Sequence, residues 1–467
     1  MTAEMRLPVR SDVVADGASV HLVGVGGMGM RGLAILLAAE GLRVSGCDAR
    51  PPAAADDLSA AGIEVRSGHD PAHLAGVDQV VASAAVASEC PELVAARESG
   101  IPVLKRARAL GALVNGRRLV AVAGTHGKTT ITAMTAVAAE AAGLSAGAVV
   151  GGRVPSWGGF ARPRGDGPMI VEADEYDRAF LELDPHLAVV TSVEPEHLEC
   201  YGDLAMLRQA FLEFATRAAT RDGILLCADD PGALAIQREL GRTETYGLAP
   251  DADYCVERLD AGGGGQRCRL STPDGGSFEF ELGAPGRHNA QNAGAALAAV
   301  LMLGGAPARL RDALAEFRGV GRRLEHLGTR AGVVIVDDYA HHPTEVRASI
   351  AALREAHPGR RLVVAFQPHL YSRTAALADE FARALQEADH AFVLPVYPAR
   401  EMPIEGVTSE LIVSRGEDLA AADEALVLAE VGQAAGTDTV FAFMGAGSVT
   451  GLAHRALAGG GDDGLGD

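Results

Sequence analysis

Seven consecutive residues, 124–130, have the types and order of a loop that binds nucleotide phosphates. They stand between an apolar run at 119–123, predicted to be a strand, and a small-residue stretch at 131–142, predicted to be a helix. A glycine turn at such a junction directs backbone N–H groups and the positive end of the helix dipole at an anion. In a phosphate loop the lysine reaches the outer phosphates and the next hydroxyl binds Mg²⁺. The predicted ATP-binding residues are Gly124, Thr125, His126, Gly127, Lys128, Thr129 and Thr130.

Lysine is rare in this chain, which strengthens the prediction for Lys128. The sequence holds two lysines, Lys105 and Lys128, and uses arginine everywhere else. An ammonium is a compact point charge, unlike a planar guanidinium. The alternative is a glycine-rich turn with a solvated lysine. Val122 replaces the first glycine of the common G-x-x-x-x-G-K-[ST] pattern, which indicates a subclass of nucleotide-binding proteins.

A second glycine motif, at 24–29, reads Gly-Val-Gly-Gly-Met-Gly and also joins a predicted strand to a predicted helix. Asp48 follows near the end of the next strand, where an acid that binds ribose would stand. Alone, the motif would predict a dinucleotide such as NAD. Because a phosphate loop follows and no hydride chemistry is evident, a substrate that contains a diphosphate is favoured.

Carboxylates gather where a later strand ends. Residues 172–177 include Glu172, Asp174, Glu175 and Asp177. Clustered like charges need cations, arginines or water, and Mg²⁺ is the natural partner beside a phosphate loop. The alternative is a solvated acidic loop. His197 follows the strand predicted at 189–192, on the side where such sheets bind ligands, so a metal or phosphate role is expected.

Further polar residues follow in the second half of the chain. Asn289 and Asn292 lie at i,i+3 on one face of a predicted helix, where amides could bind a purine edge, although an asparagine there is often only a cap. Arg323 lies at a predicted hinge and could meet a developing phosphoryl charge. His341 and His342 are consecutive, so a single bidentate metal site is not expected, and a substrate-holding role is preferred. Arg373 could bind a carboxylate.

Length and the alternation of strands and helices predict three α/β domains. A chain of 467 residues is too long for one core. The pattern restarts three times and predicts parallel, doubly wound sheets, with turn-rich antiparallel hairpins at 252–282. We expect domains at 1–116, 117–321 and 322–458, and a disordered tail at 459–467.

Composition restricts the class of protein. The net charge of −20 argues against a nucleic-acid surface. The six cysteines show no C-x-x-C pair or metal-like spacing, which is typical of cytosolic thiols. The sequence shows no signal peptide and no membrane span, so a cytoplasmic protein is expected. It leaves open whether the protein is a monomer or a homodimer.

Taken together, these motifs resemble the Mur ligase family, ATP-dependent amide-forming enzymes of peptidoglycan precursor synthesis. The resemblance rests on the glycine motif at 24–29, the loop at 124–130 and the Asp-Asp-Tyr-Ala-His-His-Pro-Thr-Glu segment at 337–345. It implies a Rossmann-like UDP-binding domain, a central ATPase-like domain with a parallel sheet and small antiparallel hairpins, and a Rossmann-like C-terminal domain. The implied reaction joins L-alanine to the lactyl carboxylate of UDP-N-acetylmuramate through an acyl phosphate, with ATP and Mg²⁺.

The resemblance also implies roles for individual residues. Thr129, Glu172 and His197 would hold the metal, and Lys128, Glu172, His197, Arg323 and Asp338 would be catalytic. Asn289, Asn292 and Arg323 would bind ATP beside the loop, and Tyr339, His341 and Arg373 would bind the amino acid. The UDP-sugar would contact Gly26, Gly27, Met28, Gly29, Asp48, His69 and Ser83.

Three departures from the family pattern bear on the reaction. Tyr176 replaces a frequent serine, and Leu370 replaces a frequent arginine. The chain has no lysine after Lys128, so it cannot carry the carbamoylated lysine of later-acting members, which favours the alanine-adding reaction. Two rivals stay open: a recycling ligase that attaches an intact tripeptide, and a nucleotide-binding regulatory protein, for which NAD is one candidate ligand, that closes around its ligands without catalysis.

Overall fold

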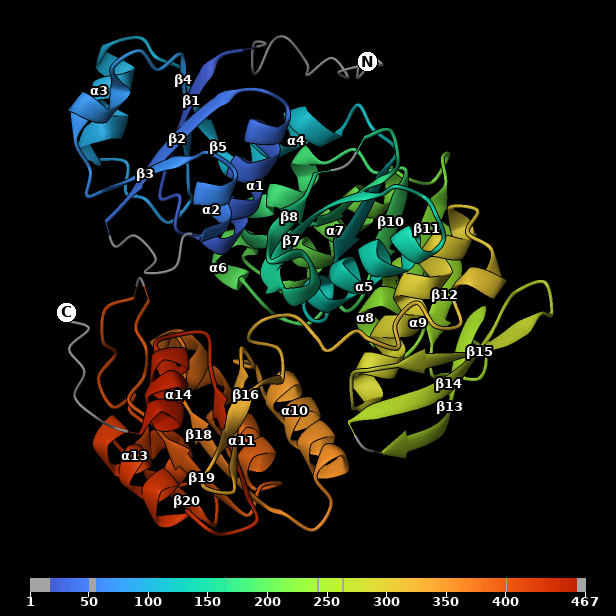
Figure 1. Ribbon diagram of the computed structural model, residues 1–467, viewed down its shortest axis with the longest axis vertical. Helices are drawn as coiled ribbons and strands as arrows, with labels where there is room; N and C mark the ends of the chain where they lie inside the picture. Colours follow the sequence, from blue (N-terminus) through green and yellow to red (C-terminus); the bar gives the residue numbers. More distant parts are fainter. Residues whose placement is uncertain are drawn as a thin grey trace. The chain divides into compact units, whose positions relative to one another are not determined.

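The computed structural model describes residues 17–49, 56–163, 165–241, 243–262, 264–399 and 401–459 (Figure 1). Of the predicted tail, Gly459 is described and residues 460–467 lie outside the described residues. Residues 1–16 also lie outside them. Two compact units divide the chain. One comprises Met1–Glu257, Arg269–Phe280 and Gln291–Leu314, and the other comprises Arg258–Cys268, Glu281–Ala290 and Ala315–Asp467.

The first sheet is parallel and has the order β3-β2-β1-β4-β5. The chain first adds strands on one side of β1 and then continues on its other side with β4, so β1 and β4 form a topological switch point. Ligands bind at such a point, beyond the carboxyl ends of the strands. Its elements are β1 (Ser19–Val23), α1 (Met28–Ala39), β2 (Arg43–Asp48), α2 (Asp56–Ala60), β3 (Glu64–Ser67), the 3₁₀ helix η1 (Pro71–Leu74), β4 (Gln79–Ala82), α3 (Pro91–Glu98), β5 (Val103–Lys105) and α4 (Arg106–Val114).

The second sheet has ten strands in the order β15-β14-β13-β12-β11-β10-β6-β9-β7-β8. Strand β6 reads Leu-Val-Ala-Val-Ala and is buried throughout, as expected of a central parallel strand covered on both faces. Its strands are β6 (Leu119–Ala123), β7 (Gly147–Val154), β8 (Gly159–Arg162), β9 (Met169–Glu172), β10 (Leu187–Val190), β11 (Gly223–Cys227), β12 (Glu244–Gly247), β13 (Tyr254–Gly262), β14 (Gly265–Ser271) and β15 (Ser277–Leu282).

The helices that accompany this sheet are α5 (Lys128–Ala141), η2 (Pro155–Trp157), η3 (Tyr176–Glu182), α6 (Leu198–Tyr201), α7 (Leu204–Thr216), α8 (Pro231–Leu240), α9 (Arg287–Met302) and η4 (Pro307–Arg309). The short turns between β13, β14 and β15 agree with the predicted hairpins, since only antiparallel strands can be joined so briefly. The antiparallel edge strand β8 was not predicted.

The third sheet has the order β16-β17-β21-β18-β19-β20, with only β16 antiparallel to its neighbour. Apolar clusters cover both faces, which explains why its central strands are continuous apolar runs. Its elements are β16 (Glu325–Arg330), β17 (Val333–Asp338), α10 (Pro343–Ala356), β18 (Arg361–Phe366), α11 (Tyr371–Leu385), β19 (His390–Val393), α12 (Glu410–Val413), β20 (Leu419–Ala421), α13 (Glu424–Gln433), β21 (Thr439–Met444) and α14 (Val449–Ala458).

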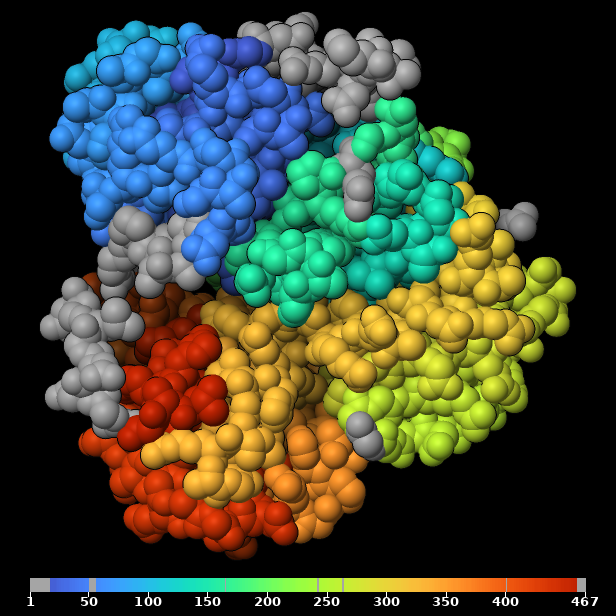
Figure 2. Space-filling view, viewed as in Figure 1, coloured from blue at the N-terminus to red at the C-terminus, as the bar shows by residue number. Residues whose placement is uncertain are grey.

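Within the first unit, α1 lies against β7 and β8 of the second sheet. Arg31 of α1 stacks over the Phe160 ring with 4.8 Å between the guanidinium carbon and the ring centroid. The blue surface of the first sheet's elements adjoins the blue-green surface of β7 and β8 in the space-filling view (Figure 2). Each sheet falls within one predicted domain, and the α/β class is confirmed; the domain boundaries stay predictions.

Candidate active site

The predicted phosphate loop turns from β6 into α5 as expected. Gly124 and Gly127 have φ values of +136° and +79°, a region that glycine enters without a steric cost. Because the first N–H groups of a helix have no partner within that helix, the start of α5 offers donors to an anion.

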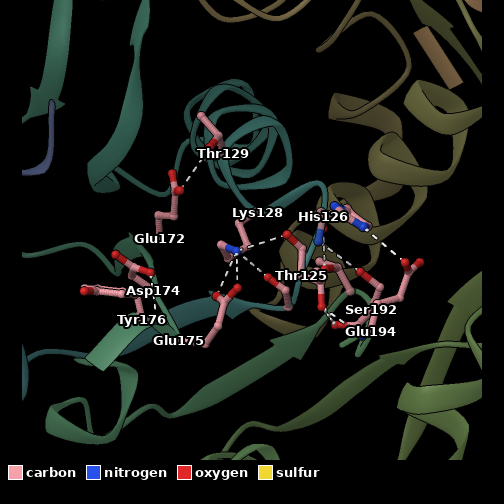
Figure 3. Close-up of polar contacts among 12 residues, drawn as sticks. Thr125, His126, Lys128, Thr129, Glu172, Asp174, Glu175, Tyr176, Ser192 and Glu194 are labelled. Atoms are coloured by element: carbon pink, nitrogen blue, oxygen red, sulfur yellow. Dashed lines mark hydrogen bonds and ion pairs between the residues drawn. The ribbon is translucent and has the colours of Figure 1, made fainter. Parts of the chain in front are cut away.

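Lys128 is half-buried at the head of α5 and contacts a carboxylate (Figure 3). Its Nζ lies 2.8 Å from Glu175 Oε2 and also donates to the carbonyl oxygens of Gly124 and Thr125, at 2.5 and 3.2 Å. Burial favours the neutral amine, but the negative charges of Glu175 and Asp174 outweigh it and raise the pKa of Lys128. Lys128 is therefore a positively charged ammonium that Glu175 and two backbone carbonyl oxygens keep in position, where the outer phosphates would lie.

The next residue of the loop is joined to the carboxylate at the end of β9. Thr129 Oγ1 donates to Glu172 Oε1 at 2.9 Å, and the backbone N–H of Gly151 donates to Glu172 Oε2 at 2.6 Å. A hydroxyl and a carboxylate are hard oxygen donors of the kind that Mg²⁺ prefers. These two residues fit the predicted metal site.

Asp174 connects this region to the first glycine motif. Its Oδ2 lies 3.1 Å from Arg106 Nη2 at the start of α4. A Cβ placed on Gly29 would lie 2.8 Å from Arg106 Nη1, so the guanidinium lies directly beside that glycine. One arginine–aspartate pair thus lies near both predicted ligand-binding loops, since Arg106 is beside Gly29 and the charge of Asp174 raises the pKa of Lys128.

The loop after β10 supports the phosphate loop from the other side. Ser192 accepts the Thr125 N–H through its carbonyl oxygen at 2.8 Å and the His126 N–H through its hydroxyl at 3.0 Å. His126 Nε2 lies 3.5 Å from Glu194 Oε2. These contacts fix the backbone of the loop on the carboxyl-end side of the sheet.

His197, predicted as a metal ligand, lies in the left-handed backbone region with φ of 53°. Its ring contacts the Tyr176 ring edge-on at 5.1 Å between centroids, and Nδ1 lies 3.5 Å from Glu199 Oε1. Because the Tyr176 ring contacts His197 directly, the departure from serine at this position changes the surroundings of the histidine. Its metal role stays a prediction.

Most of the predicted UDP-sugar residues come together at the switch point of the first sheet. Asp48 Oδ2 accepts the Gly26 N–H at 3.0 Å, and a Cβ placed on Gly24 would lie 3.0 Å from Ser83 Cβ. His69 contacts a different partner, with Nδ1 2.9 Å from Glu92 Oε2.

Asn289 and Asn292 lie in the first turns of α9, both largely buried. Asn289 Nδ2 donates to the carbonyl oxygen of Pro285 at 2.7 Å, which ties it to the preceding turn. Asn292 Oδ1 would lie 2.9 Å from a Cβ placed on Gly127, so this amide is beside the phosphate loop.

In the second unit, the predicted amino-acid residues form one aromatic and basic cluster. The Tyr339 and His341 rings are 5.2 Å apart, and His369 bridges His341, at 6.0 Å between ring centroids, to Arg373, at 3.4 Å. The Arg323 guanidinium lies over Tyr339, 5.0 Å from the ring centroid. The structure thus brings together Tyr339, His341, Arg373 and Arg323, and their roles stay predictions.

Asp338 lies at the end of β17 beside this cluster and is buried. Burial raises the pKa of Asp338 to about 6, although a hydrogen bond with Ser349 and the charge of Arg323 oppose the shift. A carboxyl with such a pKa changes its charge in the weakly acidic range.

Sequence reasoning missed three residues of these sites. Glu175 was noted only as one of four clustered carboxylates, and its ion pair with Lys128 was not foreseen. Arg106 and Ser192 received no role. Arg106 directly follows Lys105 at a strand end, and this basic pair was the one available signal.

Comparisons with known families and proteins agree with the geometry. The family models described as "Mur ligase family, catalytic domain", "Mur ligase middle domain" and "Mur ligase, glutamate ligase domain" match residues 19–118, 122–300 and 322–447. A UDP-N-acetylmuramate–L-alanine ligase of Arthrobacter sp. (strain FB24) is 47% identical over 426 residues, which cover 89% of this chain and 90% of that protein. A ligase of the same name from Streptomyces coelicolor is 44% identical and covers 94% of this chain and 96% of its own.

Solved structures show the same architecture. The UDP-N-acetylmuramate–alanine ligase MurC of Thermotoga maritima superposes with a TM-score of 0.80 at 29% identity, covering 94% of this chain and 98% of that chain. A murein peptide ligase of Psychrobacter arcticus superposes with a TM-score of 0.72 at 23% identity, covering 97% and 100%, and shares the fold. Among the described residues, no helix is both long and apolar enough to cross a bilayer.

Proposed function

The chain belongs to the Mur ligase family, and we propose that it uses ATP to join L-alanine to the lactyl carboxylate of UDP-N-acetylmuramate. The observation that carries the proposal is the charged Lys128 at the head of α5 beside the Thr129–Glu172 pair. The relatives that share most of the chain's length are named for this reaction. Because ATP is the phosphoryl donor, we expect the reaction to take place in the cytoplasm.

The chemistry explains why such a ligase needs a phosphate loop. At neutral pH a carboxylate and an amine form a salt rather than an amide, because the carboxylate oxygen is a poor leaving group. The lactyl carboxylate attacks the γ-phosphorus of ATP, which gives an acyl phosphate and ADP. The alanine amine then attacks the carbonyl carbon and loses a proton. The bond between that carbon and the phosphate oxygen breaks, and phosphate leaves.

The residues of the chain supply position and charge for this sequence. Lys128 would neutralise the γ-phosphoryl oxygens, since the transferring group spreads negative charge over them. Glu175 holds the ammonium in place until the nucleotide arrives, because it supplies the counter-charge in a buried site. Thr129 and Glu172 would hold Mg²⁺, and a bound Mg²⁺ neutralises phosphate charge and lets the substrate carboxylate approach.

The amino acid would be received by the cluster of the second unit. Arg373 offers two N–H donors to the alanine carboxylate. Tyr339 and His341 would line the place of the alanine amine, beside Asp338. The UDP diphosphate would lie at the start of α1, near Arg106.

The test is release of phosphate from ATP by the purified full-length protein. We expect release only when UDP-N-acetylmuramate and L-alanine are present together. Release with the tripeptide L-alanyl-γ-D-glutamyl-meso-diaminopimelate in preference to L-alanine would assign the recycling reaction instead. Nucleotide binding with no release under any combination would favour the regulatory protein.

A further inference from the structure

We propose that the first domain binds one transition-metal ion of the Zn²⁺ class through His21, Cys47, His73 and Glu92, apart from the ATP site. These side chains come from β1, β2, η1 and the first turn of α3. One ligand atom from each lies within 4.8 Å of every other. None of the four has a role in the proposed ligase reaction.

The distances around Glu92 are close to those of a tetrahedral site. Its Oε1 lies 2.5 Å from His73 Nδ1 and 3.5 Å from His21 Nε2, and its Oε2 lies 2.9 Å from Cys47 Sγ. Bonds of about 2.0–2.3 Å to Zn²⁺ place tetrahedral ligand atoms about 3.3–3.8 Å apart. The four ligand atoms lie within 4.8 Å of one another, so an ion could enter with shifts of about 1 Å that move the closest atoms apart and the most distant atoms together.

One buried nitrogen indicates that the cluster is built for a further partner. His21 is fully buried, and its Nε2 forms no hydrogen bond although it faces Glu92. The other ring nitrogen, Nδ1, lies 2.9 Å from Ser45 Oγ, so that contact orients the ring with Nε2 toward the cluster. A buried polar atom without a hydrogen bond is costly, and metal-bound histidines commonly have a second-shell contact like that of Nδ1 with Ser45.

The donor types select the class of ion. Two imidazoles, one thiol and one carboxylate suit Zn²⁺ and its neighbours, whereas Mg²⁺ and Ca²⁺ prefer oxygen donors. Burial and the nearby Glu92 raise the pKa of the Cys47 thiol, so binding must displace its proton.

His69 stands at the edge of this cluster. Its Nδ1 lies 2.9 Å from Glu92 Oε2 and 3.3 Å from Cys47 Sγ. Cys47 directly precedes Asp48, whose carboxylate accepts the Gly26 N–H. A bound ion would therefore fasten β1, β2, η1 and α3 together just behind the first glycine loop.

The test is titration of metal-stripped full-length protein with Co²⁺ in excess Mg²⁺. Co²⁺ reports a thiolate ligand through a sulfur-to-cobalt charge-transfer absorption and reports tetrahedral geometry through visible d–d bands. We expect one equivalent to bind with both signals, and Zn²⁺ to displace it. A wild-type protein without the charge-transfer band would overturn the proposal.

Variants locate the site. Cys47→Ser should abolish the charge-transfer band, whereas Cys268→Ser, which also replaces a fully buried cysteine, should keep it. His73→Gln, at the most exposed of the four ligands, should weaken binding by roughly tenfold or more, and Ser45→Ala by roughly tenfold. Unchanged affinity in both His73→Gln and Ser45→Ala would also overturn the proposal. The assay uses neither ATP nor the sugar substrate, so its outcome is independent of the ligase reaction.

Discussion

The two glycine loops of the first unit occupy equivalent places but obtain their positive charge differently. Each loop joins a central parallel strand to a helix, β1 to α1 and β6 to α5. The second loop carries its cation within the motif, as Lys128. The first is served by Arg106, which comes from α4 and lies beside Gly29. A sequence motif therefore identifies the cation of a loop only when that cation lies within the motif itself, as Lys128 does and Arg106 does not.

The largest effect should follow from removing the cation of the second loop. We expect Lys128→Ala to lower turnover by roughly 10²–10³-fold, because no other charge replaces the ammonium at the transferring phosphoryl. ADP formation with UDP-N-acetylmuramate and L-alanine measures it. Lys105→Ala is the matched control, since Lys105 is exposed and pairs with Asp177. Near-normal turnover of Lys128→Ala would remove the phosphate-loop assignment.

Removing the cation of the first loop should have a smaller and selective effect. We expect Arg106→Ala to raise the KM for UDP-N-acetylmuramate by roughly 10- to 100-fold, which corresponds to the loss of a charge-assisted hydrogen bond. The KM for ATP should change little. Arg108→Ala, which removes a more exposed arginine paired with Glu182, is the control. An equal rise in both KM values would contradict the separate roles of the two loops.

A pH effect should arise outside both loops, at Asp338. Its pKa in the folded protein, about 6, lies above the usual value of an aspartate, so the folded state holds a proton that the unfolded state has released. The free energy of unfolding should therefore fall as the pH rises from about 4 to about 6, by roughly 2 kcal/mol. Urea unfolding of wild type and Asp338→Asn across this range measures it. A wild-type pH dependence that the variant fully retains would place the effect elsewhere.

The smallest effect concerns the glycine that precedes the helix in each loop. Gly127 has φ of +79°, and a Cβ there would lie 2.9 Å from Asn292 Oδ1. Gly27 has φ of −66°, and the nearest atom to a Cβ there is the carbonyl oxygen of Gly24 at 3.6 Å. We expect Gly127→Ala to lower the free energy of unfolding by about 1–2 kcal/mol and Gly27→Ala to change it by less than about 0.5 kcal/mol. Equal urea midpoints would refute this difference.

Much of the fold and part of the site could be predicted from the sequence. The three α/β sheets follow from apolar runs such as 119–123, and the neighbouring positions of Thr129 and Glu172 follow from two motifs at strand ends. The antiparallel edge strand β8 was missed although it pairs with the preceding strand β7, because its four residues, Gly159–Arg162, leave little periodic pattern in the sequence.

Contacts made through tertiary structure could not be predicted. The pairing of Lys128 with Glu175 depends on the turn after β9, and the side chains around Glu92 come from four elements between His21 and Glu92. No spacing motif connects residues so far apart. The cysteines have no metal-like spacing in the sequence, but such spacing detects only metal sites whose ligands are close together in the chain.

The contrast between the two lysines has a practical consequence for chemical labelling. Lys105 has 72% of its side chain exposed, whereas Lys128 has 14% and is clasped by a carboxylate. Amine-acylating reagents should therefore modify Lys105 readily, and any slower second modification of an internal amine must occur at Lys128, since the chain contains no other lysine. Intact mass spectrometry of the acylated protein, with and without nucleotide, would thus follow occupancy of the phosphate loop without an engineered probe.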